Sequence, residues 1–117
     1  MNGWYQLSHN DKGQYSFALK AGNAEIILSS ELYESKDSAM SGISSVQKNS
    51  TLDDRYARKV SSDGRPYFTL RSGNHEVIGT SQMYASAKNR DEGIESVKKN
   101  GSSSTVKSDA SEETPSK

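Results

Sequence analysis

The sequence predicts an α+β fold in which two pseudo-twofold-related repeats form one continuous sheet with helices packed on it. Each repeat is expected to be a three-stranded antiparallel meander followed by one helix. Residues 5–49 align with residues 56–100 without a gap, and 17 of the 45 aligned pairs are identical. Apolar side chains alternate near the start of each copy, as in strands, and recur at helical spacing near its end.

The repeat also predicts the domain organisation. Repeat 1 is expected to cover residues 3–50 and repeat 2 residues 54–101, within a single domain of residues 1–107. A unit this short cannot cover its own apolar face, so the two copies are expected to pack together as a monomer that imitates a homodimer. Residues 108–117 are polar and rich in serine, and are expected to form a disordered tail.

Strands are expected where apolar and polar residues alternate. In repeat 1 the first strand is WYQL, which begins at Trp4, and the second is YSFAL, which places Tyr15, Phe17 and Leu19 on one face. PYFTL follows the same pattern in repeat 2, and its Pro66 belongs at the start or edge of a strand because proline has no amide proton. The third strands are EIIL and EVIG, and STVK is a candidate for one more short strand.

Positive backbone φ angles are expected at two kinds of position. Gly-Asn pairs at positions 22 and 73 predict tight hairpin turns before the third strands, because glycine and asparagine tolerate positive φ best. Asn49 and Asn100 suit the left-handed residue that ends a helix.

Each third strand is followed by signals for a helix. Ser35 and Ser86 are placed to cap its first turn. Ala39, Ile43 and Val46 then recur at helical spacing in the first copy.

Each predicted helix contains a glycine near its middle. Such a glycine costs about 1 kcal/mol relative to alanine. Finding Gly42 in one copy and Gly93 in the other therefore indicates a close approach between helix and sheet, under Tyr33 and Tyr84.

The composition excludes several kinds of protein chemistry. There is no cysteine, so disulfides, thiolate nucleophiles and cysteine-ligated zinc are excluded. The N-terminal residues lack the basic start and apolar run of a signal peptide, and no segment is apolar over the length needed to span a bilayer. We expect a cytoplasmic protein without membrane contact.

The run GNAEIILSSELYESKDSAMSGISSV and its echo GNHEVIGTSQMYASAKNRDEGIESV resemble the YegP-like family, bacterial proteins with a domain of unknown function in one or two copies. The resemblance covers residues 3 to about 107. It implies that a two-copy member folds its tandem into one sheet, and that a further strand is exchanged between the halves. It implies no activity, substrate, cofactor or catalytic residue. At Ala24 and His75 the sequence departs from the usual glycine after asparagine, which puts the turn type in question.

Few residues are candidates for metal or nucleophilic chemistry. His9 is expected in a polar loop and His75 in a hairpin turn, and neither has a counterpart in the other repeat, so no metal site and no cofactor are predicted. Ser30 and Ser81 have no evident base beside them, so their hydroxyls are expected to bind backbone groups instead.

Glu25 and Glu76 occupy matched positions in the two repeats. A pseudo-twofold axis could bring their carboxylates together for general acid–base work, so a carboxylate-based enzyme at the repeat seam is one alternative function. A glutamate just after a hairpin turn more commonly faces water, or pairs across strands with a residue such as Lys20 or Arg71.

A second alternative is a weak single-stranded nucleic-acid binder that uses basic strands of repeat 2. Arginine interleaved with tyrosine suits single strands. Residues 51–100 carry nine basic and seven acidic side chains, and a net charge of +2 is small for binding driven by phosphate attraction. The residues of this predicted face are Arg55, Arg58, Lys59, Arg65 and Arg71.

Matched residues at turns, caps and core positions are what folding alone demands, so they are poor evidence of an active site. We therefore predict a small non-catalytic interaction or ligand-binding module, whose partner the sequence leaves unknown. Its binding seam between the repeats is expected near Tyr33, Tyr84, Glu25 and Glu76.

Overall fold

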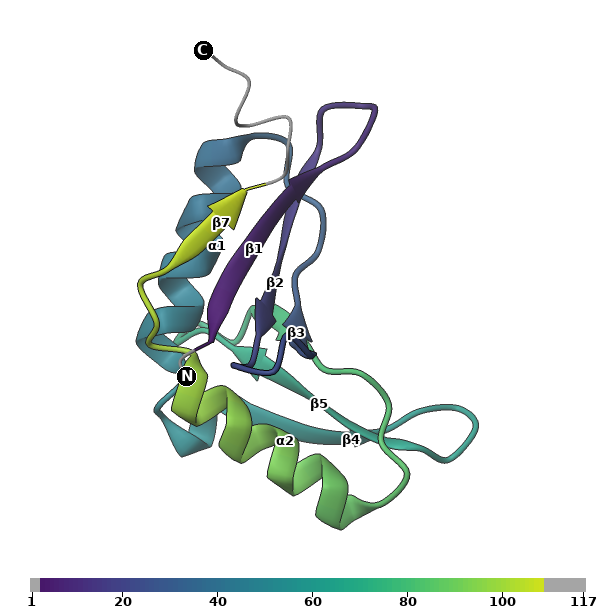
Figure 1. Ribbon diagram of the computed structural model, residues 1–117. Coiled ribbons are helices and arrows are strands. Elements are labelled where there is room, and N and C mark those ends of the chain that lie inside the picture. Colours follow the sequence, from purple (N-terminus) through teal and green to yellow (C-terminus); the bar gives the residue numbers. More distant parts are fainter. Residues whose placement is uncertain (1–2, 109–117) are drawn as a thin grey trace.

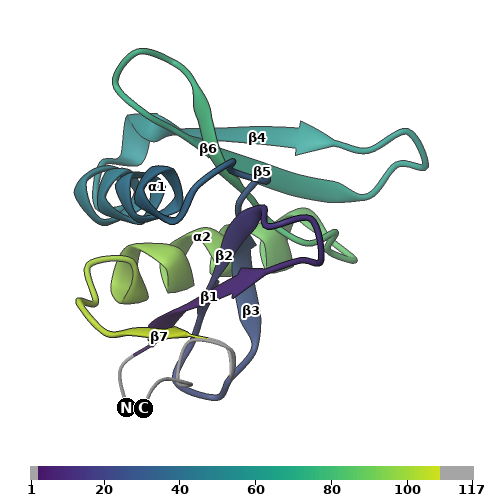
Figure 2. The same ribbon diagram turned by 90° about the horizontal axis from the view of Figure 1, so that it is seen from above.

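The computed structural model describes residues 3–108 and confirms the α+β prediction. One seven-stranded mixed sheet twists strongly, and both helices lie between its two halves (Figures 1 and 2). The elements in chain order are β1 (Trp4–His9), β2 (Tyr15–Lys20), β3 (Ile26–Ser29), α1 (Lys36–Asn49), the 3₁₀ turn η1 (Asp53–Arg55), β4 (Tyr56–Val60), β5 (Pro66–Arg71), β6 (Val77–Thr80), α2 (Ala87–Asn100) and β7 (Val106–Ser108).

The strand order β4-β5-β6-β3-β2-β1-β7 places the two meanders side by side, joined where β3 pairs with β6. All neighbouring strands are antiparallel except β1 and β7, which pair in parallel. The last two residues of the candidate strand STVK form the start of β7. This strand follows the helix of repeat 2 but pairs with β1 of repeat 1. The polar tail was expected from residue 108; Ser108 ends β7, and the rest of that tail lies outside the described residues.

The core forms where the alternating strand residues meet the helices. Phe17 and Leu19 of β2, and Phe68 and Leu70 of β5, are at most 2% exposed, as the alternation predicts. Tyr15 is half-buried at the start of β2. Burial of these side chains supplies the main driving force for folding, and because each helix packs on strands from both repeats, neither repeat buries its apolar face alone.

The positive φ angles of the hairpins lie one residue later than expected. Ala24 has φ 71° and His75 has φ 72°, whereas the Gly-Asn pairs before them have negative φ. In each turn a hydrogen bond from this residue's N–H closes a tight loop, from Ala24 to Ala21 O (2.9 Å) and from His75 to Ser72 O (2.9 Å). The sequence motif identified the turns correctly but assigned the left-handed conformation to the wrong residue.

The helix starts follow the prediction and the helix ends do not. Ser35 and Ser86 cap α1 and α2, each accepting a first-turn N–H at 3.1 Å. Asn49 ends α1 and is followed by a right-handed residue (φ −63°), so it is not the left-handed cap that we expected. Its amide instead donates to Ser45 O (2.8 Å) and accepts from Arg55 Nε (2.9 Å).

Asn100 does the same at the end of α2, where the following residue has φ −66°. Its amide donates to Ser96 O (2.8 Å) and accepts from the Gly3 N–H (2.9 Å). Asn49 therefore links the end of α1 to the residue before β4, and Asn100 links the end of α2 to the residue before β1. Both asparagines are buried.

The two mid-helix glycines permit the predicted close approach. A Cβ placed on Gly42 would lie 2.6 Å from Tyr33 Oη and 2.9 Å from Phe17 Cε2. On Gly93 it would overlap the hydroxyl of Tyr84. Both tyrosines therefore lie directly against a helix, next to the seam between the repeats.

Candidate functional site

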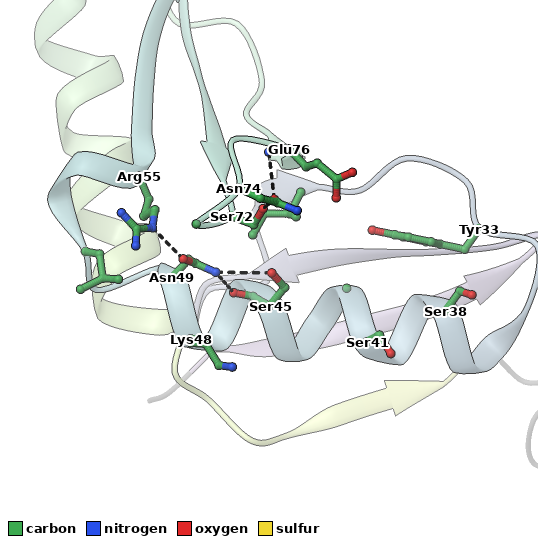
Figure 3. Close-up of a pocket in the computed structure, with 14 residues that line it drawn as sticks. Tyr33, Ser38, Ser41, Ser45, Lys48, Asn49, Arg55, Ser72, Asn74 and Glu76 are labelled. Carbon is green, nitrogen blue, oxygen red and sulfur yellow. Dashed lines mark hydrogen bonds between the residues drawn. The ribbon is translucent and has the colours of Figure 1, made fainter.

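Two grooves flank the seam, each between the helix of one repeat and a hairpin of the other. The first groove lies between α1 and the β5–β6 hairpin and encloses about 530 Å³ (Figure 3). The second groove lies between α2 and the β2–β3 hairpin and encloses about 300 Å³. Most of their lining residues correspond through the 51-residue repeat, so the grooves are related by the pseudo-twofold axis.

Tyr33 forms one end of the first groove and is held by its backbone and by its ring. Its N–H donates to Tyr15 O (2.6 Å) and its carbonyl accepts from Tyr15 N (2.8 Å), which extends the β2 pairing by one bridge. Its ring stacks on Phe17 with centroids 6.2 Å apart. Burial, together with the nearby carboxylates of Glu31 and Glu76, raises the pKa of the Tyr33 hydroxyl.

Tyr84 occupies the matching position in the second groove but is held by one backbone bond fewer. Its N–H donates to Pro66 O (2.8 Å), and Pro66 has no N–H with which to return the bond. Its ring stacks on Phe68 at 6.2 Å. Burial raises the pKa of Tyr84, and the carboxylate of Glu25 adds to the rise. The backbone of Tyr33 is therefore held by two hydrogen bonds and that of Tyr84 by one.

The structure divides the predicted binding seam between the two grooves. Tyr33 shares the first groove with Glu76, and Tyr84 shares the second with Glu25, so each groove combines a tyrosine of one repeat with a glutamate of the other. Glu25 and Glu76 are both exposed and line different grooves. The pair of carboxylates that an enzyme at the seam would need is not assembled.

The grooves differ in charge although their backbones correspond. The first groove carries Lys48 and Arg55 in addition to Glu76, whereas the second carries the carboxylates of Glu25 and Glu92. Figure 3 shows Arg55 at the opposite end of the first groove from Tyr33. Opposite charges at separate positions can orient a polar ligand along this groove.

Two side chains contact Arg55 at its end of the first groove. Its Nε donates to Asn49 Oδ1 (2.9 Å), and its Nη1 lies 3.2 Å from Asp54 Oδ1. The side chain of Asp54 is 82% exposed, so this carboxylate is a weak, solvent-screened partner. The sequence-based hypothesis assigned Arg55 to a strand face and missed its position at the groove.

A third, smaller pocket of about 250 Å³ lies beside the β5–β6 turn, and Arg55, Arg71 and His75 line it. The other residues of the predicted nucleic-acid face lie elsewhere. Arg58 pairs with Asp91 of α2 (3.0 Å), on the helix side of β4. Strand alternation places Lys59 on the opposite side. Arg65 pairs with Asp63 in the β4–β5 turn (3.0 Å), so the five residues do not share one face.

Neither histidine is placed for metal binding. His9 is the last residue of β1 rather than part of a loop, and its ring stacks on Tyr15 at 5.5 Å. His75 is exposed in its turn, as expected. Among residues 3–108 there is no group of three or more histidine, aspartate or glutamate side chains that could hold a metal ion.

The paired serines bind backbone, as predicted. Ser30 Oγ accepts from Phe17 N (2.8 Å) and donates to Glu31 O (2.8 Å). Ser81 Oγ makes the matching bonds in repeat 2, at 3.0 and 2.8 Å. No helix within the described part of the chain is long and apolar enough to cross a membrane.

Comparison with known proteins gives one consistent set of relatives. A family model described as a domain of unknown function, DUF1508, matches residues 10–56 and again residues 61–108. A UPF0339 protein of Acinetobacter baylyi is 62% identical over 92% of this chain and 96% of its own length. The UPF0339 protein YegP of Escherichia coli K12 is 55% identical over 92% of this chain and 97% of its own.

Two solution NMR structures have the same fold. The UPF0339 protein of Shewanella oneidensis gives a TM-score of 0.87 at 54% identity, over 92% of each chain. YegP of Escherichia coli, titled a protein of unknown function, gives a TM-score of 0.88 at 54% identity, over 93% of this chain and 94% of that chain. These names and titles assign no activity.

Proposed function

The chain belongs to the DUF1508 family, and from that premise and the site geometry we propose that it is a non-catalytic binding module whose ligand lies in the first groove. The family's domain has no assigned function, and the groove itself supports the proposal. The ligand is a small polar molecule or a short extended peptide that lies along α1.

One observation carries the proposal: the first groove joins elements of both repeats and presents polar groups from each. The helix supplies Ser38 and Ser45, and the hairpin supplies Asn74 and Glu76. Tyr33 adds an aromatic surface beside its hydroxyl. A groove of about 530 Å³ has the size typical of small-molecule sites, and its convergent polar groups can fix the orientation of a ligand.

The arrangement favours binding over catalysis. Acid–base catalysis by two carboxylates needs them on opposite sides of one substrate, and Glu25 and Glu76 line separate grooves. In the first groove, Lys48 and Arg55 lie toward one end and Glu76 lies between them and Tyr33, so opposite charges at separate positions can orient a ligand (Figure 3).

We also propose that the chain acts as a monomer in the cytoplasm, without a membrane partner. The monomer is supported by the pseudo-twofold packing, because each repeat already covers its apolar face with the other. Cell fractionation tests the location, and light scattering tests the monomer.

The test is a set of NMR titrations that uses the pseudo-twofold axis as its control. Amide spectra of the ¹⁵N-labelled protein are followed during addition of free amino acids, dipeptides and neutral sugars. We expect at least one class to shift the amides of α1 and of residues 72–78. Ser45→Phe narrows the first groove and should weaken that binding at least about tenfold.

Ser96→Phe is the matched control, because Ser96 makes the same bonds to Asn100 that Ser45 makes to Asn49. It changes the second groove and should leave the binding unchanged. The proposal is wrong if shifts cluster away from the first groove, or if both variants weaken binding equally.

A further inference from the structure

We infer that the pocket beside the β5–β6 turn, lined by Arg55, Arg71 and His75, is a binding site for a small anion, a phosphate or carboxylate group. We call it the anion pocket, and its other lining residues are Asp54, Tyr56, Ala57 and Ser72. It shares Arg55 and Ser72 with the first groove, so the two sites are told apart by the residues they do not share: shifts in α1 mark the groove, and shifts at residues 54–57 mark the anion pocket.

Two arginines of repeat 2 line the anion pocket. Tyr56 pairs with Leu70 across β4 and β5, and Arg55 and Arg71 are the residues next to this pair, at the end of η1 and at the end of β5. Like charges that line one pocket repel each other. The corresponding rung of repeat 1 is Trp4 opposite Lys20, which carries a single charge. The doubled positive charge therefore exists only in repeat 2.

Arg71 carries a hydrogen-bond donor that the protein leaves unused. Its Nε is buried and has no hydrogen-bond partner, one of three such side-chain atoms among residues 3–108. A buried donor without a partner costs about 1–3 kcal/mol. Because Arg71 also lines the pocket, an anionic oxygen there would accept from its guanidinium group and would offset the repulsion between the two guanidinium groups.

Asp54 is the competing anion. Its carboxylate lies 3.2 Å from Arg55 Nη1. The Asp54 side chain is 82% exposed, so it can move aside when an anion binds. A bound phosphate would be repelled by this carboxylate, so Asp54 lowers the affinity of the pocket. At about 250 Å³ the pocket has room for inorganic phosphate or for the charged end of a larger ligand.

The counterpart of the pocket in repeat 1 lacks this chemistry. The residues matching Arg55, Arg71 and His75 are Trp4, Lys20 and Ala24. Lys107 of β7 lies over the Trp4 ring, with Nζ 4.1 Å from its centroid. The chain itself thus provides a control position, matched through the repeat, that lacks the two arginines.

The experiment titrates the intact ¹⁵N-labelled protein with sodium phosphate and, separately, sodium acetate, with sodium chloride keeping the ionic strength constant. We expect saturable shifts confined to residues 54–57 and 71–75 and to the Arg71 Nε–Hε signal. The anion that binds more tightly identifies phosphate or carboxylate as the ligand group. Arg71→Gln should weaken binding at least about tenfold, while Arg71→Lys tests whether charge alone suffices.

Three further variants make the result decisive. Asp54→Asn should strengthen binding several-fold, because it removes the competing carboxylate, and this gain cannot arise from damage to the fold. Lys20→Gln and Arg65→Gln remove one positive charge at the matched rung and at the other hairpin, and should change nothing. The inference is overturned if shifts rise linearly at basic residues in general, or if Arg71→Gln binds the anion as tightly as the wild type.

Discussion

At the scale of single residues, Ala24 has an unfavourable backbone conformation. Its φ of 71° lies in the left-handed region, which costs an L-residue other than glycine about 1–2 kcal/mol. Ala24→Gly should therefore raise the free energy of unfolding by about 0.5–1 kcal/mol, after the larger chain entropy of glycine in the unfolded state is subtracted. Urea denaturation measures this change.

Ala21→Gly is the matched control in the same turn, because Ala21 does not have a positive φ. It adds the same unfolded-state entropy without relieving strain and should lower stability by up to about 1 kcal/mol. Equal losses from both variants would show that the left-handed conformation carries no strain.

Asp91 provides a pH-dependent contribution at the same scale. Hydrogen bonds from Arg58 and from Arg90 lower the pKa of Asp91 below its usual value. A carboxyl group whose folded pKa is depressed stabilises the fold above its unfolded pKa, and that contribution is lost as the pH falls through the folded value. Asp91→Asn should therefore be less stable than the wild type at pH 7 and equal to it in strong acid.

Urea denaturation of both proteins between pH 7 and pH 2 measures this difference. The Asp91 side chain is half exposed, so the expected loss at pH 7 is small. A stability gap that stays constant over the whole pH range would mean that the lost contact is not ionic.

At the scale of elements, the seam between β3 and β6 depends on two residues of unequal size. Leu28 is fully buried, and a Cβ on Gly79 would lie 2.6 Å from Leu28 Cγ. Positions 28 and 79 correspond through the repeat. Leu28 therefore fills the space that Gly79, which has no side chain, leaves empty. Leu28→Gly should lower the free energy of unfolding by about 3–5 kcal/mol, because it leaves a cavity.

Gly79→Leu alone should also destabilise the protein, by overpacking the seam. The double variant Leu28→Gly with Gly79→Leu exchanges the two residues across the pseudo-twofold axis, and should recover about 2 kcal/mol or more relative to the sum of the single losses. Urea denaturation of the four proteins gives this coupling. Strict additivity would show that the two positions do not share one space.

Much of the element level could be predicted from the sequence, because it depends on local signals. Alternation and the Gly-Asn turns predicted the strands of the meanders, and the serine caps predicted the helix starts. The pairing of β7 with β1 could not be read from the residues alone, because Val106 meets Tyr5 only through the fold of the whole chain. The roles of Asn49 and Asn100 were missed for the same reason: each binds a group distant in sequence or beyond a turn.

The candidate sites were predicted in part. Tyr33 and Glu76 were singled out, but their sharing of one groove depends on which helix packs beside which hairpin. Arg55 and Arg71 were named within a broader basic face. A signal for their proximity was present, because shifting the Trp4–Lys20 pair of repeat 1 by 51 residues gives Arg55 and Arg71.

At the scale of the whole molecule, the two repeats are joined at two equivalent junctions between a helix end and an outer strand. At one, the chain runs from α1 through η1 into β4, and Tyr56 Oη donates to Ser50 O (2.6 Å). At the other, the end of α2 meets the start of β1 without a covalent bond, and Tyr5 Oη donates to Gly101 O (2.5 Å). The fold therefore already tolerates one non-covalent junction.

This equivalence predicts that the chain can be cut at the covalent junction and still assemble. Fragments 1–52 and 53–117, refolded together, should form a 1:1 complex, because the helices pack on strands from both repeats and β7 of the second fragment pairs with β1 of the first. A dimer of the first fragment would place two Leu28 side chains in the space at the seam that holds one. A dimer of the second fragment would place two Gly79 residues there and leave that space empty.

Native mass spectrometry and size-exclusion chromatography distinguish the assemblies. The mixed complex should exceed either homodimer at equal fragment concentrations, and Leu28→Gly in the first fragment should reduce that preference. Each fragment alone should be unfolded or self-associated, since a single repeat leaves its apolar face uncovered. A first fragment that is a folded monomer by both methods would show that one repeat completes its own core, and that the seam does not hold the fold together.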